Sequence, residues 1–327
     1  MIVLGVESSC DETSVALVKD GKDILSNVVA SSLKFHSKHG GVVPEIASRM
    51  QLESISGVFL EAIKIAGIKT EDIDLVSVTS GPGLPGSLLV GISFAKALAL
   101  SLNKPIFGVN HIHSHIYANL LCHKDIKLPC IALIVSGGHT TLFYIKDFSE
   151  IKTIGQTLDD ACGEAFDKVA KIMGMDYPGG PEIEKFSKGA DKHKFKFACC
   201  GTDDEFNFSF SGIKTALLYS FKNKKISAKL KKDMAASFQE SIIKALVKKS
   251  ISACKHYGVR NLLIGGGVIA NCSLRQRFSE TAQENGLNCF FPDTFLCMDN
   301  AAMVAGLANY LYKQGKRSNF NLNIEFN

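Results

Sequence analysis

The apolar residues of this chain recur in short runs that end at small or polar residues. Residues 2–6 and 13–18 are strand-like runs joined by Glu-Ser-Ser-Cys-Asp-Glu at 7–12. Residues 131–145 repeat the arrangement around a central Ser-Gly-Gly-His. Two apolar runs joined by a polar turn are typical of a β-hairpin. Similar hairpins in the two halves predict a duplicated α/β protein with a cleft between the copies.

Two further predicted strands each lead through a glycine-rich turn into a helix. The strand at 75–78 is followed by a turn at 79–87 and a helical run at 88–102. The strand at 261–264 enters Gly-Gly-Gly-Val-Ile-Ala-Asn at 265–271 and then another helical run. Strands that alternate with helices in this way favour an α/β fold.

Composition places the chain among ordinary globular proteins. It has 327 residues, of which 46% are hydrophobic and 21% charged, enough for two domains. The apolar N-terminus lacks a basic region and meets Glu7 at once, so it predicts a first strand rather than a signal peptide. No window approaches the ~20 apolar residues of a membrane span. We therefore expect a cytoplasmic protein with no membrane partner.

The net charge of +5 is mild, but the lysines are clustered. Either cluster alone is explained by a solvated surface, whereas both together indicate a polyanion-binding surface. The first cluster is Lys185, Lys188, Lys192, Lys194 and Lys196, and the second is Lys222, Lys224, Lys225, Lys229, Lys231 and Lys232.

A histidine pair is the first candidate for chemistry. His111 and His115 are four residues apart, so on a helix they share one face and can bind one metal ion. Incidental packing is the competing interpretation. The pair is not a metalloprotease motif, because Ile112 stands where H-E-x-x-H requires glutamate.

A two-histidine site needs a further ligand, and Asp299 is the candidate. Either Asp299 or Asn300 is well placed to cap a helix predicted at 301–311, so capping is the alternative role for Asp299. Two imidazoles and a carboxylate would suit iron(II) or zinc better than magnesium.

The three glycine-rich turns at strand ends, at 81–87, 136–138 and 265–271, offer backbone N–H groups to a phosphate. Neither a P-loop nor a complete G-x-G-x-x-G motif is present, but three such turns favour a nucleotide cleft. Glu7, Asp11 and Glu12 in the first hairpin would repel a phosphate unless a cation or an amine lies between them.

Seven motifs occur in order through almost the entire chain: Gly-Val-Glu-Ser-Ser-Cys-Asp-Glu-Thr-Ser at 5–14, Gly-Gly-Val-Val-Pro-Glu-Ile-Ala-Ser-Arg at 40–49, Gly-Pro-Gly-Leu at 81–84, the His111 and His115 pair, Val-Ser-Gly-Gly-His-Thr at 135–140, Gly-Gly-Gly-Val-Ile-Ala-Asn at 265–271, and Asp-Asn-Ala-Ala-Met at 299–303. Together they resemble the bacterial form of the TsaD family, formerly called O-sialoglycoprotein endopeptidases. Gln51 departs from the family pattern, in which a histidine is usual at this position.

The resemblance implies an actin-like ATPase fold, with two duplicated α/β lobes and an interlobe cleft. The lobes are expected at 1–107 and 108–303, with a C-terminal helix at 304–327 packed on the first and the metal and nucleotide sites in the second. It also implies that the protein transfers a threonylcarbamoyl group from threonylcarbamoyl-AMP to N6 of adenosine 37 in tRNAs reading codons that begin with A.

The resemblance implies the site residues as well. His111, His115 and Asp299 correspond to the metal ligands, with iron(II) expected and zinc as the alternative. The residues that line the site for ATP, ADP or threonylcarbamoyl-AMP are Ile134, Val135, Ser136, Gly137, Gly138, Asp167, Gly180, Glu184 and Asn271. Asp11 and Glu12 are the candidates for the carboxylate that takes the proton of the adenine amine.

The expected partners are tRNA and, in bacteria, a degenerate TsaB-like paralogue and a small TsaE-like ATPase. Two other functions stay open: a carboxylate or sugar kinase of the same fold, and a noncatalytic nucleotide-binding scaffold. Such kinases favour Asp-x-Gly-Thr in the first hairpin, where this chain has Glu-Ser-Ser-Cys.

Overall fold

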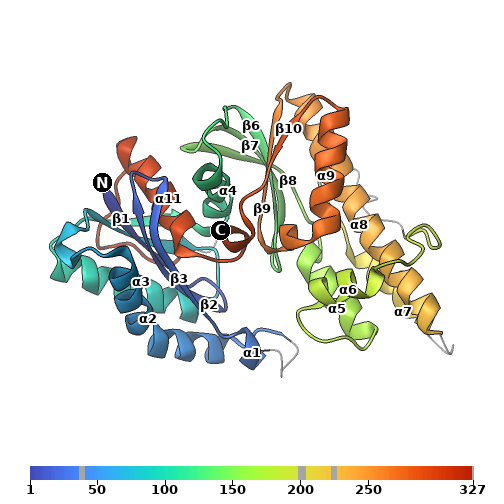
Figure 1. The fold of residues 1–327 in the computed structure, drawn as a ribbon, viewed down its shortest axis with the longest axis horizontal. Coiled ribbons are helices and arrows are strands. Elements are labelled where there is room, and N and C mark those ends of the chain that lie inside the picture. The colour runs from blue at the N-terminus through green and yellow to red at the C-terminus, as the bar shows by residue number, and fades with distance from the viewer. Residues whose placement is uncertain (37–40, 198–203, 222–226, 326–327) are drawn as a thin grey trace. The chain divides into compact units, whose positions relative to one another are not determined.

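The computed structural model describes residues 1–36, 41–197, 204–221 and 227–325, which form two compact units (Figure 1). Unit 1 consists of Met1–Asp125 and Pro292–Asn327, and unit 2 of Ile126–Phe291. Unit 1 therefore extends past the lobe boundary expected at residue 107. Among the described helices, none combines the length and apolar character that crossing a bilayer requires.

Unit 1 is built on a five-stranded sheet in the order β3-β2-β1-β4-β5. Its strands are β1 (Ile2–Glu7), β2 (Glu12–Lys19), β3 (Asp23–Ser31), β4 (Leu75–Gly81) and β5 (Ile106–Asn110). The first three strands are antiparallel, whereas β4 and β5 run parallel to β1. The carboxyl ends of β1, β4 and β5 therefore meet at one edge of the sheet.

Helices cover both faces of this sheet (Figure 1), which explains why nearly every residue of β1 is buried. Long α2 and α3 pack on one face and α11 on the other. The helices of unit 1 are α1 (Leu33–His36), α2 (Pro44–Ala66), the 3-10 turn η2 (Thr70–Asp72), α3 (Pro85–Ser101), α4 (His111–Cys122), α10 (Thr294–Cys297) and α11 (Ala301–Lys313).

Helix α2 shows why this sequence folds as it does. Its buried residues recur every three or four positions, which is the spacing of one helix face: Ala47, Gln51, Ile55, Val58 and Ala62. Proline opens the helix at Pro44, and Gly67 ends it in the left-handed conformation (φ 64°), donating its N–H to the carbonyls of Ile63 and Lys64.

Unit 2 repeats the topology of unit 1. Its sheet has the order β10-β9-β6-β7-β8, which read from β8 to β10 is the order of unit 1. Strands β6, β7 and β8 are antiparallel to their neighbours, whereas β9 and β10 run parallel to β6. Its elements are β6 (Cys130–Val135), β7 (Thr140–Asp147), β8 (Glu150–Gln156), α5 (Cys162–Ile172), α6 (Gly179–Ser187), α7 (Ser211–Phe221), α8 (Ala228–His256), β9 (Asn261–Gly265), η3 (Gly267–Ala270), α9 (Cys272–Glu284) and β10 (Asn288–Phe290). The duplication predicted from the two hairpins is confirmed.

The C-terminal segment belongs to unit 1, but its helix is shorter than the expected 304–327. Helix α11 ends at Lys313, and the chain continues without helix through residue 325. Leu322 and Ile324 pack against the core of unit 1, and Glu325 N–H donates to the carbonyl of Ser80 at 2.8 Å. Apolar packing of extended chain, rather than a longer helix, covers this part of the sheet.

Helix α11 lies directly on β1 at Gly5. A Cβ at Gly5 would lie 2.3 Å from the carbonyl oxygen of Ala301 and 2.9 Å from the nitrogen of Ala305, both backbone atoms. Neither atom can move without shifting the helix. Since α11 begins two residues after Asp299, this contact also fixes the backbone that leads to the site described below.

We expect Gly5→Ala to lower the free energy of unfolding by about 1–3 kcal/mol, because the added methyl group must displace α11. Gly57→Ala is the control, since Gly57 lies on the exposed side of α2 with nothing within 4 Å of the added atom. That change should raise stability by about 0.5–1 kcal/mol. Urea unfolding followed by circular dichroism measures both, and a Gly5→Ala midpoint equal to wild type would contradict the tight packing.

Candidate functional site

Helix α4 carries His111 and His115 one turn apart on the same face, as their four-residue spacing predicts. It starts directly after β5, where the Asn110 side chain caps it by accepting the N–H of His113 at 3.1 Å. The rings of His111 and His115 are buried, with centroids 4.7 Å apart and planes at 80°. These rings are packed inside unit 1 and do not face solvent.

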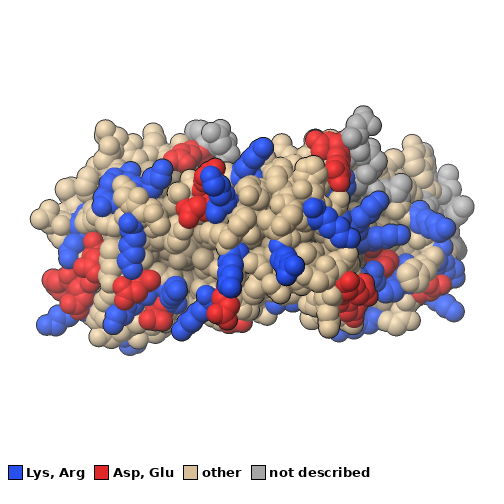
Figure 2. Space-filling view, turned by 90° about the horizontal axis from the view of Figure 1, so that it is seen from above, with Lys and Arg blue, Asp and Glu red and all other residues tan. Residues whose placement is uncertain are grey.

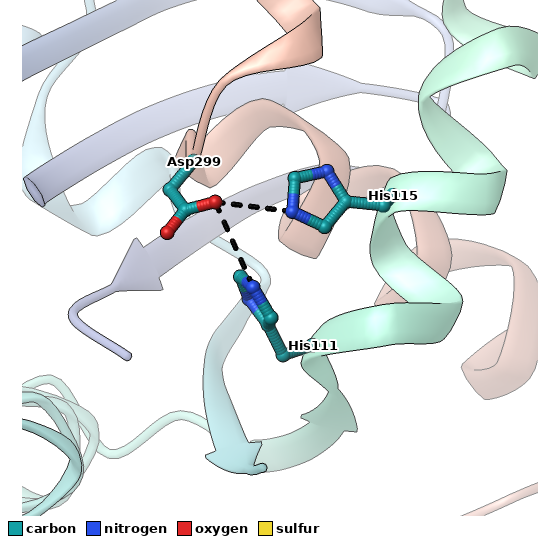
Figure 3. A group of neighbouring side chains, drawn as sticks. All are labelled: His111, His115 and Asp299. Carbon is teal, nitrogen blue, oxygen red and sulfur yellow. Dashed lines mark hydrogen bonds and ion pairs between the residues drawn. The ribbon is translucent and has the colours of Figure 1, made fainter. Parts of the chain in front are cut away.

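Asp299 joins the two rings from the other end of the chain (Figure 3). Its Oδ1 lies 3.0 Å from Nε2 of His115 and 3.6 Å from Nε2 of His111. The cap of α11 is Asn300, whose side chain accepts the N–H of Met303 at 3.1 Å. Of the two residues that could have capped this helix, Asn300 does so, and the carboxylate of Asp299 faces the histidines.

This geometry fits a metal ion. The three ligand atoms lie within 4.8 Å of one another, and both histidines direct Nε2 to the same carboxylate oxygen. Two imidazole nitrogens and one carboxylate oxygen suit iron(II) or zinc. All three residues belong to unit 1, rather than to the lobe at 108–303 in which they were expected.

Glu7 lies behind His111. It is the last residue of β1 and is fully buried, with Oε2 3.0 Å from Nδ1 of His111. Burial opposes the charge of Glu7, but the charge of His111 and its hydrogen bond outweigh burial and lower the pKa of Glu7. Burial likewise disfavours charge on His111, but the charges of Glu7 and Asp299 raise the pKa of His111 to about 9. Sequence reasoning identified Glu7 only as an acid in the first turn.

The structure also brings Asp11 and Glu12 to Asp299. One carboxylate oxygen from each of the three lies within 4.8 Å of the others. Glu12 is buried, and its burial, together with the charges of Asp299 and Asp11, raises its pKa to about 10. Three acids this close repel one another unless a proton or a cation lies between them.

Gln51 fixes the loop that carries these acids. From the buried face of α2, its Nε2 donates to the carbonyls of Cys10 at 2.9 Å and Glu12 at 3.1 Å. The departure from the family pattern at Gln51 thus has a structural role. Sequence reasoning could not assign that role, because the contact joins positions about forty residues apart.

In unit 2, the predicted phosphate turn follows β6. Ser136 and His139 close this turn with two hydrogen bonds, and Gly137 and Gly138 are exposed with open space where a Cβ would lie. The side chains of Ile134 and Val135 are fully buried in β6. These two residues can therefore offer only backbone groups to a ligand.

The other predicted nucleotide residues lie on or beside α5, α6 and α9, which hydrogen bonds join to one another. Asp167 on α5 accepts the N–H of Gly179, one residue before Gly180, at 2.7 Å. Burial raises the pKa of Asp167, although this hydrogen bond opposes the shift. Glu184 on α6 accepts the N–H of Cys272 at 2.8 Å, at the start of α9.

Asn271 adds two more hydrogen bonds to this series. Its Oδ1 accepts the N–H of Leu274 at 2.9 Å and caps α9, while its Nδ2 donates to Gln239 of α8 at 2.9 Å. Glu184 also lines a pocket of about 290 Å³, together with residues from the end of α6, from α8 and from α9. The structure thus brings Asp167, Gly180, Glu184 and Asn271 together within unit 2.

The two five-stranded sheets of the same topology, together with similar solved structures, show that the chain has the actin-like ATPase fold. Component A of (R)-2-hydroxyglutaryl-CoA dehydratase from Acidaminococcus fermentans superposes with a TM-score of 0.57 at 13% identity, covering 97% of this chain and 100% of that one. A model of the TsaD family, described as tRNA N6-adenosine threonylcarbamoyltransferase, matches residues 23–306.

Curated relatives agree with the family model. Proteins named tRNA N6-adenosine threonylcarbamoyltransferase from Thermosipho africanus and Protochlamydia amoebophila are 50% and 49% identical to this chain. The first alignment covers 98% of both chains, and the second covers 97% of this chain and 95% of the relative. The chain belongs to the TsaD family of tRNA-modifying acyltransferases. This membership favours the transferase over the kinase and scaffold alternatives.

The raised pKa values predict how stability depends on pH in protein stripped of metal by a chelator. Folded Glu12 and His111 hold protons up to about pH 10 and 9, whereas unfolded chains release them near 4.5 and 6.5. The folded state therefore binds more protons, and the free energy of unfolding should fall as the pH rises from 6.5 to 9.

Glu12→Gln should make this fall shallower, because an amide needs no proton to be neutral. Urea unfolding at several pH values, with chelator present throughout, measures the slope. Equal slopes in the variant and wild type would show that Glu12 keeps its charge in the folded protein.

Proposed function

We propose that this protein transfers the threonylcarbamoyl group of threonylcarbamoyl-AMP to N6 of adenosine 37 in tRNAs that read codons beginning with A. Its membership of the TsaD family supports this function. The observation that carries it is the convergence of His111, His115 and Asp299 on one point. The reaction is assigned to the cytoplasm.

In the proposed reaction the N6 amine attacks the carbamoyl carbon of the donor. The new N–C bond forms, the bond from that carbon to the phosphate oxygen breaks, and AMP leaves with the electron pair. The adenine amine is a weak nucleophile because its lone pair is delocalised into the ring. Positioning, and a carboxylate that accepts the amine proton, therefore contribute most. Asp11 and Glu12 are assigned this proton-accepting role.

His111, His115 and Asp299 would hold the metal, with iron(II) favoured over zinc. When bound, such an ion supplies positive charge that offsets the charge developing on the donor during transfer. The backbone N–H groups of Gly137 and Gly138 are assigned to the donor phosphate, because both glycines are exposed and nothing lies within 4 Å of where their Cβ atoms would stand.

The rest of the donor, or ATP or ADP, is assigned to the connected residues of unit 2. Asp167 and Glu184 hold the first turns of α6 and α9 in place through their backbone contacts. Gly180 lies in that first turn of α6 with open space beside it. Asn271, fixed between α8 and α9, completes the proposed adenylate site.

The lysine clusters support a tRNA surface on unit 2. Lys194 pairs with Asp233 of α8 at 3.3 Å, and Lys232 of α8 lies over the ring of Phe186 of α6 at 5.7 Å. These contacts bring Lys194 of the first cluster to α8 and Lys232 of the second cluster to α6, whereas Lys222, Lys224 and Lys225 lie outside the described residues. Figure 2 shows Lys and Arg side chains interspersed with acidic ones, with a basic group towards its right-hand end. Such a surface binds phosphates with strong salt dependence.

Protein partners are part of the proposal: a TsaB-like paralogue and a TsaE-like ATPase. Unit 1 offers large apolar side chains in solvent on α2 and α3, as a protein interface would require. They are Leu52, Leu60, Ile65, Leu89 and Leu100.

The direct test incubates the purified protein, alone and with both partners, with threonylcarbamoyl-AMP and unmodified tRNA, and analyses the nucleosides by mass spectrometry. We expect threonylcarbamoyladenosine from wild type and a loss of at least about 100-fold with His111→Ala or Asp299→Ala. Both variants should also retain less metal after dialysis. A complete absence of product with every partner combination would refute the transferase, and unchanged metal in both variants would refute the ligand set.

The phosphate turn is tested separately by Gly137→Ala. The methyl group has open space within the protein, so folding should be unaffected, but it would stand where a phosphate approaches the backbone. We expect adenylate binding, measured by calorimetry, to weaken about tenfold, or about 1.4 kcal/mol. Gly212→Ala, on α7 with equally open space, should bind as wild type does. Equal affinities in all three proteins would exclude the turn from the adenylate site.

A further inference from the structure

We propose that Glu7 is a positioning residue of the metal centre. Its carboxylate holds a proton on Nδ1 of His111 and so leaves Nε2, the atom that faces Asp299, free to bind the ion. The inference rests on the proposed metal site and adds to it a residue that touches neither the ion nor the substrate.

The surroundings of Glu7 favour a carboxylate that accepts hydrogen bonds. The N–H of Ser9 donates to Oε1 at 2.6 Å, and the hydroxyl of Thr79 donates to Oε2 at 2.6 Å. Nδ1 of His111 lies 3.0 Å from the same Oε2. Since the carboxylate is fully buried, the favourable partner at Nδ1 is an N–H. The hydroxyl of Ser9, 3.2 Å from Nδ1, can accept or donate and fits this state.

The position of that proton decides whether His111 can bind a metal. A neutral imidazole has one N–H and one nitrogen lone pair, and a metal ion needs the lone pair. With the hydrogen held on Nδ1, the lone pair is on Nε2, which is the nitrogen directed at Asp299. A carboxylate behind a histidine ligand also fixes the orientation of the ring.

His115 provides an internal comparison. Its Nε2 also faces Asp299, at 3.0 Å, but its buried Nδ1 has no hydrogen-bond partner in the described part of the chain. Glu7 therefore acts on one of the two histidines, and the loss of Glu7 should weaken metal binding through His111 alone.

Glu7→Gln tests the proposal, because the site dictates how the amide is oriented. The Ser9 N–H can only donate, so the amide oxygen must take the place of Oε1. The NH₂ group then takes the place of Oε2 and donates to Nδ1 of His111. The ring proton is forced onto Nε2, the metal-binding atom. We expect the affinity for Co²⁺, titrated by its visible absorption, to fall 10- to 100-fold.

Nitrogen-15 NMR of histidine-labelled, metal-free protein reports the proton directly at a pH above the His111 pKa of about 9, where the ring is neutral and carries one N–H. The Nδ1 signal of His111, assigned by its loss in His111→Ala, should be that of a protonated nitrogen in wild type and of an unprotonated one in Glu7→Gln. A residue with only a structural role would not move the proton between the two nitrogens.

Asp74→Asn is the matched control. Asp74 lies at the opposite end of the same strands, where its carboxylate accepts the N–H of Ile2 at 2.8 Å, so this variant should bind Co²⁺ as wild type does. Thermal unfolding of each metal-free protein shows whether a variant is folded. If Glu7→Gln does not fold, the wild-type Nδ1 signal alone decides.

An unprotonated Nδ1 in wild type overturns the proposal. So does wild-type Co²⁺ affinity in Glu7→Gln while His111→Ala has lost the ion, a result that leaves the proposed metal site and the transferase intact. Retention of Co²⁺ by His111→Ala refutes the metal site itself, and with it this inference.

Discussion

A fully buried carboxylate has to be surrounded by hydrogen-bond donors, and the arrangement of unit 1 meets that requirement at Glu7. Its partners Thr79 and His111 stand at the ends of β4 and β5, which run parallel to β1. Parallel strands bring their carboxyl ends to one edge of a sheet, so residues more than a hundred positions apart meet there. Asp299 reaches the same edge because α11 lies directly on β1 at Gly5.

The sheet of unit 2 has the same topology, but the groups at its strand ends carry the opposite charge preference. β1 ends at Glu7 and is followed by a turn that leads through Asp11 to Glu12, whereas β6 is followed by Ser136 and two exposed glycines. At the end of β9, Gly266 (φ 90°) approaches so closely that a Cβ would lie 2.4 Å from the carbonyl of Val135. Acids at a strand end attract a cation, whereas bare backbone N–H groups attract an anion. The duplicated sheet thus carries the proposed cation site in one unit and the proposed anion site in the other.

Sequence patterns predicted the elements that local periodicity determines, and the site only in part. The hairpins, the helix carrying His111 and His115, and the repeated topology are confirmed, because alternation and four-residue spacing are local properties. Asp299 could not be separated from Asn300 as a helix cap, since both side chains can cap and only the packed fold shows which one does. Thr79 gave no signal, and Gln51 was noticed only as a departure from the family pattern, because each acts through a partner distant in the chain. The helix expected over 304–327 failed because apolar contacts of extended chain replace it after Lys313.

The electrostatics of unit 1 explain why acids and histidines belong in one site of an enzyme whose donor carries a phosphate. Asp11, Glu12 and Asp299 would by themselves repel that donor. The raised pKa values of Glu12 and His111 favour protons on both groups in the folded chain, and such protons would offset this negative charge. A divalent cation between the histidines and Asp299 would supply the same compensation and release those protons. The free carboxylates would then be able to accept a proton from an amine, which a site neutralised by its own protons could not do.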